Sequence, residues 1–110
     1  MPKNFTKIKN AVLGKRYDLS VAFLSPKEMR AVTRRTKKLD KVSNVLSFPL
    51  SKTSGEILIC KKAAAPYTLP YLFIHGLLHL KGFKHSARME GAEQELLQRF
   101  SLHAKNRNRH

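Results

Sequence analysis

The chain has 110 residues, 42% of them hydrophobic, which is enough apolar material for one domain with one core spanning residues 1–110. Its 22 Lys and Arg residues outnumber its 7 Asp and Glu residues, so the formal net charge is +15. A surface of this charge favours an anionic partner, first of all nucleic acid, although a basic tail that binds nothing is the alternative. The N-terminus lacks a secretory signal and no apolar run spans a bilayer, so we expect a cytoplasmic protein.

The first predicted elements are a strand and a helix. Residues 17–24 alternate small and apolar side chains, which predicts a strand with one buried face. A helix start follows, with Ser25 as the N-cap, Pro26 in the first turn and Glu28 placed to reach back to the cap. We expect this helix to run to about Thr36.

Two further strands are predicted before the middle of the chain. Residues 43–49 are rich in β-formers, and Pro49 is expected to end the strand because proline has no amide proton. Residues 56–60 are almost all apolar, which indicates a strand buried on both faces and paired with its predecessor. Cys60, the single cysteine, is expected to be a buried and inert thiol.

Two helices are predicted in the C-terminal part. Residues 71–80 are apolar nearly all round, which predicts a buried central helix that Gly82 ends. Residues 87–100 form an amphipathic pattern with acids in its first turns and an apolar side made of Met89, Ala92, Leu96 and Phe100. From about residue 101 the chain has no apolar periodicity, and we expect a frayed basic tail.

Basic side chains recur at helical spacing on the first predicted helix and just after it, so their charge is expected to form a line. We predict that these residues are the RNA-facing surface: Lys27, Arg30, Arg34, Arg35, Lys37 and Lys38.

Three histidines in eleven residues form the strongest chemical signal. His75 and His79 are four residues apart, so a helix places both imidazoles on one face, one turn apart. Gly82 lets the chain leave the helix and bring His85 back to close the site. Three neutral histidines would leave the fourth position of a tetrahedral zinc ion for water, which is the arrangement of a catalytic and not of a structural site. His103 and His110 lie in the polar tail and are not expected to be ligands.

The residue after the first histidine limits the possible reactions. A metallopeptidase of this helical type carries a glutamate there as general base, whereas this chain has Gly76. A water on the ion, with its pKa lowered to about 7, could instead attack a phosphodiester that nearby positive charge has polarised.

Three segments resemble the motifs of a known family. The run from His75 to His85, with Gly82 between, is similar to the signature of the YbeY family of bacterial metal-dependent endoribonucleases. Residues 44–49 resemble that family's second motif, and residues 55–59 resemble its third, in the family's order.

The resemblance implies an α+β fold in which a small, mostly antiparallel sheet packs against helices, with one zinc ion held by His75, His79 and His85 in a basic cleft. It also implies an endoribonuclease that cuts single-stranded RNA in ribosomal RNA maturation, at the 3′ end of 16S rRNA, and works with the small ribosomal subunit. The role of the family's arginine upstream of the second motif falls on Lys37 or Arg35, and His75, Lys37 and Arg35 are therefore the expected catalytic residues. The family's acid before the third histidine is Lys84 here.

A second hypothesis stays open on the residues alone. The chain could be a ribosome-associated RNA-binding protein in which a structural zinc only stabilises the fold. Such a site would need a fourth protein ligand, for which Cys60 and Glu56 are the candidates.

Overall fold

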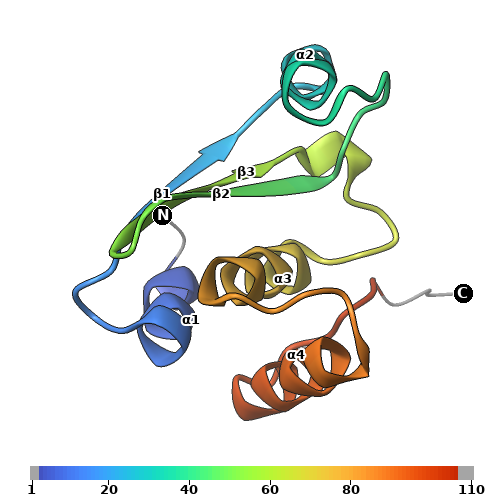
Figure 1. The fold of residues 1–110 in the computed structure, drawn as a ribbon. Helices are drawn as coiled ribbons and strands as arrows, with labels where there is room; N and C mark the ends of the chain where they lie inside the picture. The colour runs from blue at the N-terminus through green and yellow to red at the C-terminus, as the bar shows by residue number, and fades with distance from the viewer. Residues whose placement is uncertain (1–2, 107–110) are drawn as a thin grey trace, which may run out of the picture.

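The computed structural model describes residues 3–106 of the chain, and Figure 1 shows the arrangement of its elements. In chain order these elements are α1 (Lys3–Leu13), β1 (Asp18–Phe23), α2 (Pro26–Lys37), β2 (Val45–Ser51), β3 (Ser54–Ile59), the 3-10 helix η1 (Lys61–Ala63), α3 (Leu69–Lys81) and α4 (Ala87–Arg99). The described part of the chain contains no helix that is both long enough and apolar enough to cross a membrane.

The fold is α+β, as expected, but its sheet is mixed and not mostly antiparallel. The strand order is β1-β3-β2, with β3 antiparallel to β2 and parallel to β1. The cause is the connection through α2, which returns the chain so that β2 runs against β1. The tight turn after β2 then reverses the direction again, which makes β3 parallel to β1.

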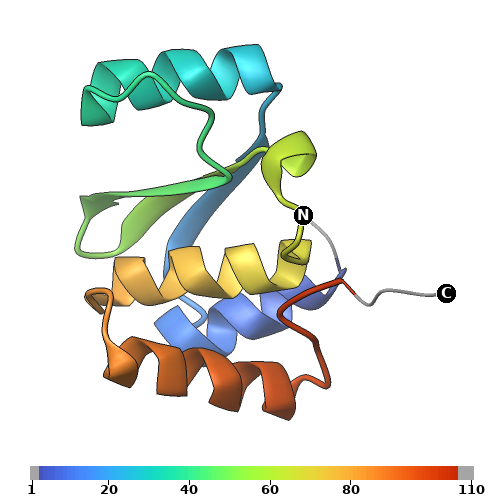
Figure 2. The same cartoon turned by 90° about the vertical axis from the view of Figure 1, so that its right-hand side faces the viewer.

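Helices cover both faces of this sheet. In Figures 1 and 2, α2 lies over one face, α1 and α3 lie under the other, and α4 packs on the outer side of α3. The larger apolar cluster joins β3 to the three helices on its side, and the smaller one lies under α2. Cys60 belongs to this smaller cluster and is fully buried, as predicted.

The predicted central helix is α3, and it packs unusually close to the sheet. Its buried residues include Phe73, Ile74 and Leu77, each 0% exposed. A Cβ atom added at Gly76 would lie only 3.1–3.3 Å from side-chain atoms of Ile57 on β3. Glycine at this position therefore allows the helix to approach the strand, and it brings the neighbouring His75 close to the sheet.

The structure differs from the sequence predictions at two further points. No helix was predicted at the N-terminus, but α1 forms there, and Phe5, Ile8 and Val12 lie at helical spacing and are all buried. The ring of Phe5 stacks on Phe73 with 3.9 Å between centroids, which fixes α1 against α3. Pro49 does not end β2, which continues to Ser51 with an irregularity in register between these two residues.

The segment after α4 is held in place over its described length. We expected fraying from about residue 101, whereas the chain returns to the loop before α3. The Thr68 hydroxyl donates to the carbonyl of His103 at 2.7 Å, and the Asn106 amide donates to the carbonyl of Pro66 at 2.8 Å. The expectation for the last four residues, 107–110, lies outside the described part of the chain.

Candidate metal centre

His75, His79 and His85 come together as predicted. One ligand atom from each lies within 4.8 Å of the other two, and the Nε2 atoms of His75 and His79 are 3.1 Å apart. Two nitrogens of a tetrahedral zinc site, each about 2.0–2.1 Å from the ion, would be roughly 3.3 Å apart. The two helical imidazoles are therefore already close to the spacing that one ion requires.

The end of α3 explains how the third histidine reaches the first two. Gly82 caps the helix with φ of 111°, a left-handed conformation that glycine adopts without strain. The Phe83 amide then donates to the carbonyl of Leu78 at 2.9 Å, which folds the chain back along the helix. This turn brings His85, which is exposed, beside the other two rings.

Hydrogen bonds on the far side of both helical rings fix their orientation. Because the Phe83 carbonyl can only accept, the nitrogen of His79 that carries the proton is Nδ1, which donates to it at 3.0 Å. His75 Nδ1 donates in the same way to the Glu93 carboxylate at 2.5 Å. Both rings thus turn their Nε2 atoms toward a common point, the orientation that a shared metal ion would need.

Burial adds to the preference for neutral ligands. It lowers the pKa of His79, and this effect outweighs the hydrogen bond to Phe83, which acts in the opposite direction. Because a metal ion binds imidazole in its unprotonated form, a lowered pKa keeps this ligand available at neutral pH.

Glu93 on α4 is the residue that the sequence analysis missed. Its side chain is 4% exposed and accepts from both His75 and the Tyr71 hydroxyl, the latter at 3.4 Å. Burial, followed by the charge of Glu93, raises the pKa of Tyr71 to about 12, so this hydroxyl remains a donor. A carboxylate behind a ligating histidine holds the ring in place and increases its basicity.

The triad opens onto a cleft of about 660 Å³. One side is formed by the three histidines and Gly76, and the other by β2 and the segment that leads from α2 into it. The residues that line this second side are Lys37, Leu39, Lys41, Val42, Ser43, Asn44, Val45, Leu46, Ser47 and Pro49. Neither Asp nor Glu lines the cleft, so its two ammonium groups, on Lys37 and Lys41, have no carboxylate beside them in the lining.

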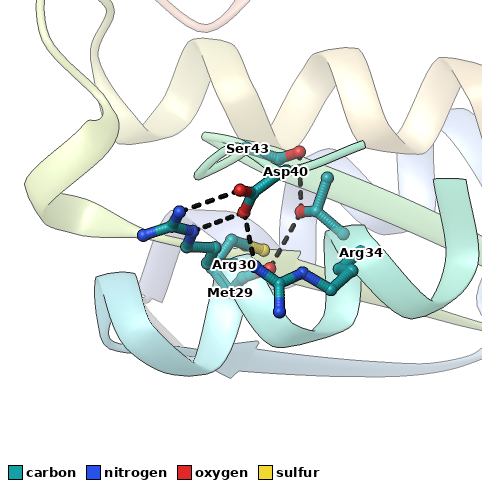
Figure 3. A network of polar contacts seen from close by, with 6 residues as sticks. Met29, Arg30, Arg34, Asp40 and Ser43 are labelled. Atoms are coloured by element: carbon teal, nitrogen blue, oxygen red, sulfur yellow. Dashed lines mark hydrogen bonds and ion pairs between the residues drawn. The ribbon is translucent and has the colours of Figure 1, made fainter. Parts of the chain in front are cut away.

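The structure separates the predicted basic surface into two groups. All six residues are exposed, but of these only Lys37 lines the cleft, and Arg35 does not. Arg30 and Arg34 instead bind Asp40, at 2.6 and 2.8 Å for their shortest contacts (Figure 3). Lys41, which lies after α2 and was not predicted to belong to the RNA surface, also lines the cleft.

Among the His, Cys, Asp and Glu side chains of the described residues, none joins the three histidines as a fourth ligand. The group of candidate ligand atoms within residues 3–106 contains the triad alone. Cys60 is buried with Met29 and Leu58 in the smaller apolar cluster, whereas α3 packs in the larger one. A metal ion held by the three histidines would have no fourth ligand from these residue types, and the histidines line the cleft, which fits a catalytic ion better than a structural one.

Comparison with known proteins identifies the family. A family profile described as Endoribonuclease YbeY matches residues 3–104. Proteins named Endoribonuclease YbeY are similar in sequence: one from Campylobacter jejuni is 33% identical over 103 residues, covering 77% of this chain and 76% of its own. One from Macrococcus caseolyticus is 30% identical, with 77% and 73% covered. A solution structure of a Thermotoga maritima protein has the same fold, with a TM-score of 0.58 at 22% identity over 90% of this chain and 83% of its own. The chain belongs to the endoribonuclease YbeY family.

Proposed function

We propose that the chain is a zinc-dependent endoribonuclease that cuts single-stranded RNA in the cleft between α3 and β2. Its proposed role is maturation of the 3′ end of 16S rRNA, in the cytoplasm and together with the small ribosomal subunit. The observation that carries this proposal is the convergence of three histidines on a cleft that Lys37 and Lys41 line and no carboxylate enters.

Zinc suits the donor set. Three imidazole nitrogens are one of the ligand sets of catalytic zinc, in which water or substrate occupies the fourth position. A bound zinc ion would supply a Lewis acid and lower the pKa of a coordinated water toward neutrality. The chain provides the Nε2 atoms of His75 and His79, while Glu93 and the Phe83 carbonyl hold the two rings at their Nδ1 atoms.

The cleft lysines would act on the phosphate. Lys37 and Lys41 both line the cleft, where they would neutralise the RNA backbone, and the proposed role of Lys37 is to stabilise the charge that builds on the phosphate oxygens during cleavage. Lysine does this as a point charge, without the two-pronged contact that an arginine would make. Arg35 does not line the cleft, so we assign the role to Lys37.

The competing function is an RNA-binding protein with a structural metal. A structural zinc site is closed by four protein ligands. The His, Cys, Asp and Glu side chains of the described residues offer three, and those three line the basic cleft. This arrangement favours the nuclease.

The test is cleavage of a single-stranded RNA, compared with its duplex, by untagged zinc-loaded protein. We expect wild type to cut the single strand, and His75→Ala to lose both activity and metal. Lys37→Ala should keep its metal and cut more slowly by about 100-fold. Lys52→Ala, an exposed lysine outside the cleft lining, is the matched control and should match wild type.

A mock purification controls for contaminating nuclease. If His75→Ala cuts as fast as wild type, the activity belongs to a contaminant and the binding-protein function is favoured.

A further inference from the structure

The outer edge of β2 forms part of the cleft wall. Because β3 lies between β1 and β2, the other side of β2 has no strand partner within residues 3–106. Asn44, just before β2, and the first three residues of β2, Val45, Leu46 and Ser47, line the cleft consecutively. Since successive side chains of a strand point to opposite faces, a consecutive run on one cleft means that the strand presents its edge there.

The register shows which backbone groups face outward. The Cys60 amide donates to the carbonyl of Asn44 at 3.0 Å, so these two residues form a hydrogen-bonded antiparallel pair. Hydrogen-bonded pairs alternate along the ladder, so Leu46 and Phe48 also bond to β3. The N–H and C=O groups of Val45 and Ser47, between them, point away from β3.

Pro49 supports this assignment. It lies two residues after Ser47 and has the same outward parity. A proline is tolerated in a strand where its missing N–H would have faced away from the ladder. The irregular register that follows it, before Ser51, does not affect the pairs from Val45 to Phe48.

The charges of the cleft favour an anionic ligand. Two lysines and no carboxylate line it, so the cleft attracts an anionic chain, whereas the two lysines do not attract a neutral peptide backbone. The two outward amides are about 7 Å apart along the strand and can donate to anionic oxygens. Backbone amides contact nucleic-acid phosphates in the same way, without reading the sequence.

We propose that the outer edge of β2 is a phosphate-binding rail for single-stranded RNA, with the N–H groups of Val45 and Ser47 as its donors. The rail holds the RNA backbone beside the histidine triad, on the cleft wall that also carries Lys37 and Lys41. The proposal rests on the proposed function, because it names how that site holds its substrate.

The first test observes the amides directly in zinc-loaded wild-type protein by NMR, with a single-stranded 2′-O-methyl-RNA octamer as the probe. We expect the amides of Val45 and Ser47 to shift and to exchange with solvent about tenfold more slowly in the complex. Leu46 and Phe48, bonded to β3 throughout, are the internal controls. If the octamer binds and the Val45 and Ser47 amides neither shift nor slow, the proposal is wrong.

The second test removes one donor. Ser47→Pro deletes the outward N–H and leaves the bonds to β3 in place, while Ser47→Ala deletes only the hydroxyl. We expect Ser47→Pro to bind the octamer about tenfold more weakly, as loss of one charge-assisted hydrogen bond predicts, with the slope of log affinity against log salt unchanged. Lys41→Ala should instead reduce that slope by about 0.7. Equal affinity of folded Ser47→Pro and Ser47→Ala would overturn the proposal.

A neutral eight-residue extended peptide is the comparison ligand. If the peptide slows exchange at Ser47 and the octamer does not, the edge is a peptide-docking site and the RNA rail is wrong. Failure of the proposed function has a different signature, in which the octamer slows exchange at Ser47 but no RNA is cut by wild type. If wild type cuts RNA but the octamer leaves exchange at Val45 and Ser47 unchanged, the rail is wrong and the proposed nuclease function stands.

Discussion

Glu93 allows a graded test of the metal centre. Its carboxylate accepts from His75 Nδ1 at 2.5 Å, and the side chain is 4% exposed, so water cannot easily replace it. Removing such a partner from a metal-ligating histidine typically costs 10- to 100-fold in metal affinity. At about 1.4 kcal/mol per tenfold, this range corresponds to roughly 1.4–2.8 kcal/mol.

Two substitutions of Glu93 should fall at the two ends of this 10- to 100-fold range of metal affinity. Glu93→Gln keeps an oxygen that can accept from His75 but loses the charge, so we expect about tenfold weaker zinc binding. Glu93→Ala removes the acceptor and leaves the Nδ1 donor of the half-buried His75 without its partner, so we expect about 100-fold weaker zinc binding. The assay is competition with a chromophoric chelator. Circular dichroism verifies the fold of each variant.

The matched control is Glu95→Gln, which removes the same charge from an exposed position of α4. It should bind zinc like wild type. If Glu93→Ala also bound zinc as tightly as wild type, the carboxylate would not position His75, and the proposed orientation of the triad would lose its support.

Three further outcomes are expected. Gly76→Ala should lower the melting temperature, because the new methyl group is forced against buried Ile57. Gly91→Ala on α4, where the new methyl group meets open space, should raise it. Equal shifts in the two variants would contradict the close packing of α3 on β3. Arg30 and Arg34 hold the pKa of Asp40 well below its ordinary value, so its contribution to stability is complete above about pH 4 and is lost as the pH falls through the lowered pKa. The melting temperatures of Asp40→Asn and wild type should therefore differ slightly above that pH and converge in stronger acid, and a difference that grew in acid would count against the ion pairs. Lys37→Ala should reduce the salt slope of single-stranded RNA binding by about 0.7, while Arg35→Ala should leave it unchanged; the opposite result would place the phosphate at Arg35.

Local patterns in the sequence predicted most of the fold. The cap formed by Ser25 and Glu28 starts α2 as expected, and the end of α3 at Gly82 was predicted from glycine's conformational freedom alone. The triad was predictable because four residues make one helical turn, and the return of His85 needs only that glycine. The sequence pattern was thus informative wherever the determinant lies within a few residues.

Contacts between distant segments were not predictable in this way. Glu93 lies 18 residues beyond His75, and its role depends on how α4 packs against α3. One signal was available, since a glutamate four residues after Met89 occupies the apolar side of an amphipathic helix. The mixed sheet depends on the path of the chain through α2, which no periodicity records.

The basic residues of α2 show why charge along a helix is a weak guide to function. Lys38 caps the C-terminal end of α2 in a left-handed conformation with φ of 59°, and the chain turns back there. Asp40 then binds Arg30 and Arg34, and this network fixes the returning segment against the helix (Figure 3). Two arginines that sequence spacing assigns to RNA are thereby engaged in holding a loop. The positive charge of the cleft comes from the last residue of α2, Lys37, and from that loop, so a phosphate-binding site here depends on the turn more than on the helix face.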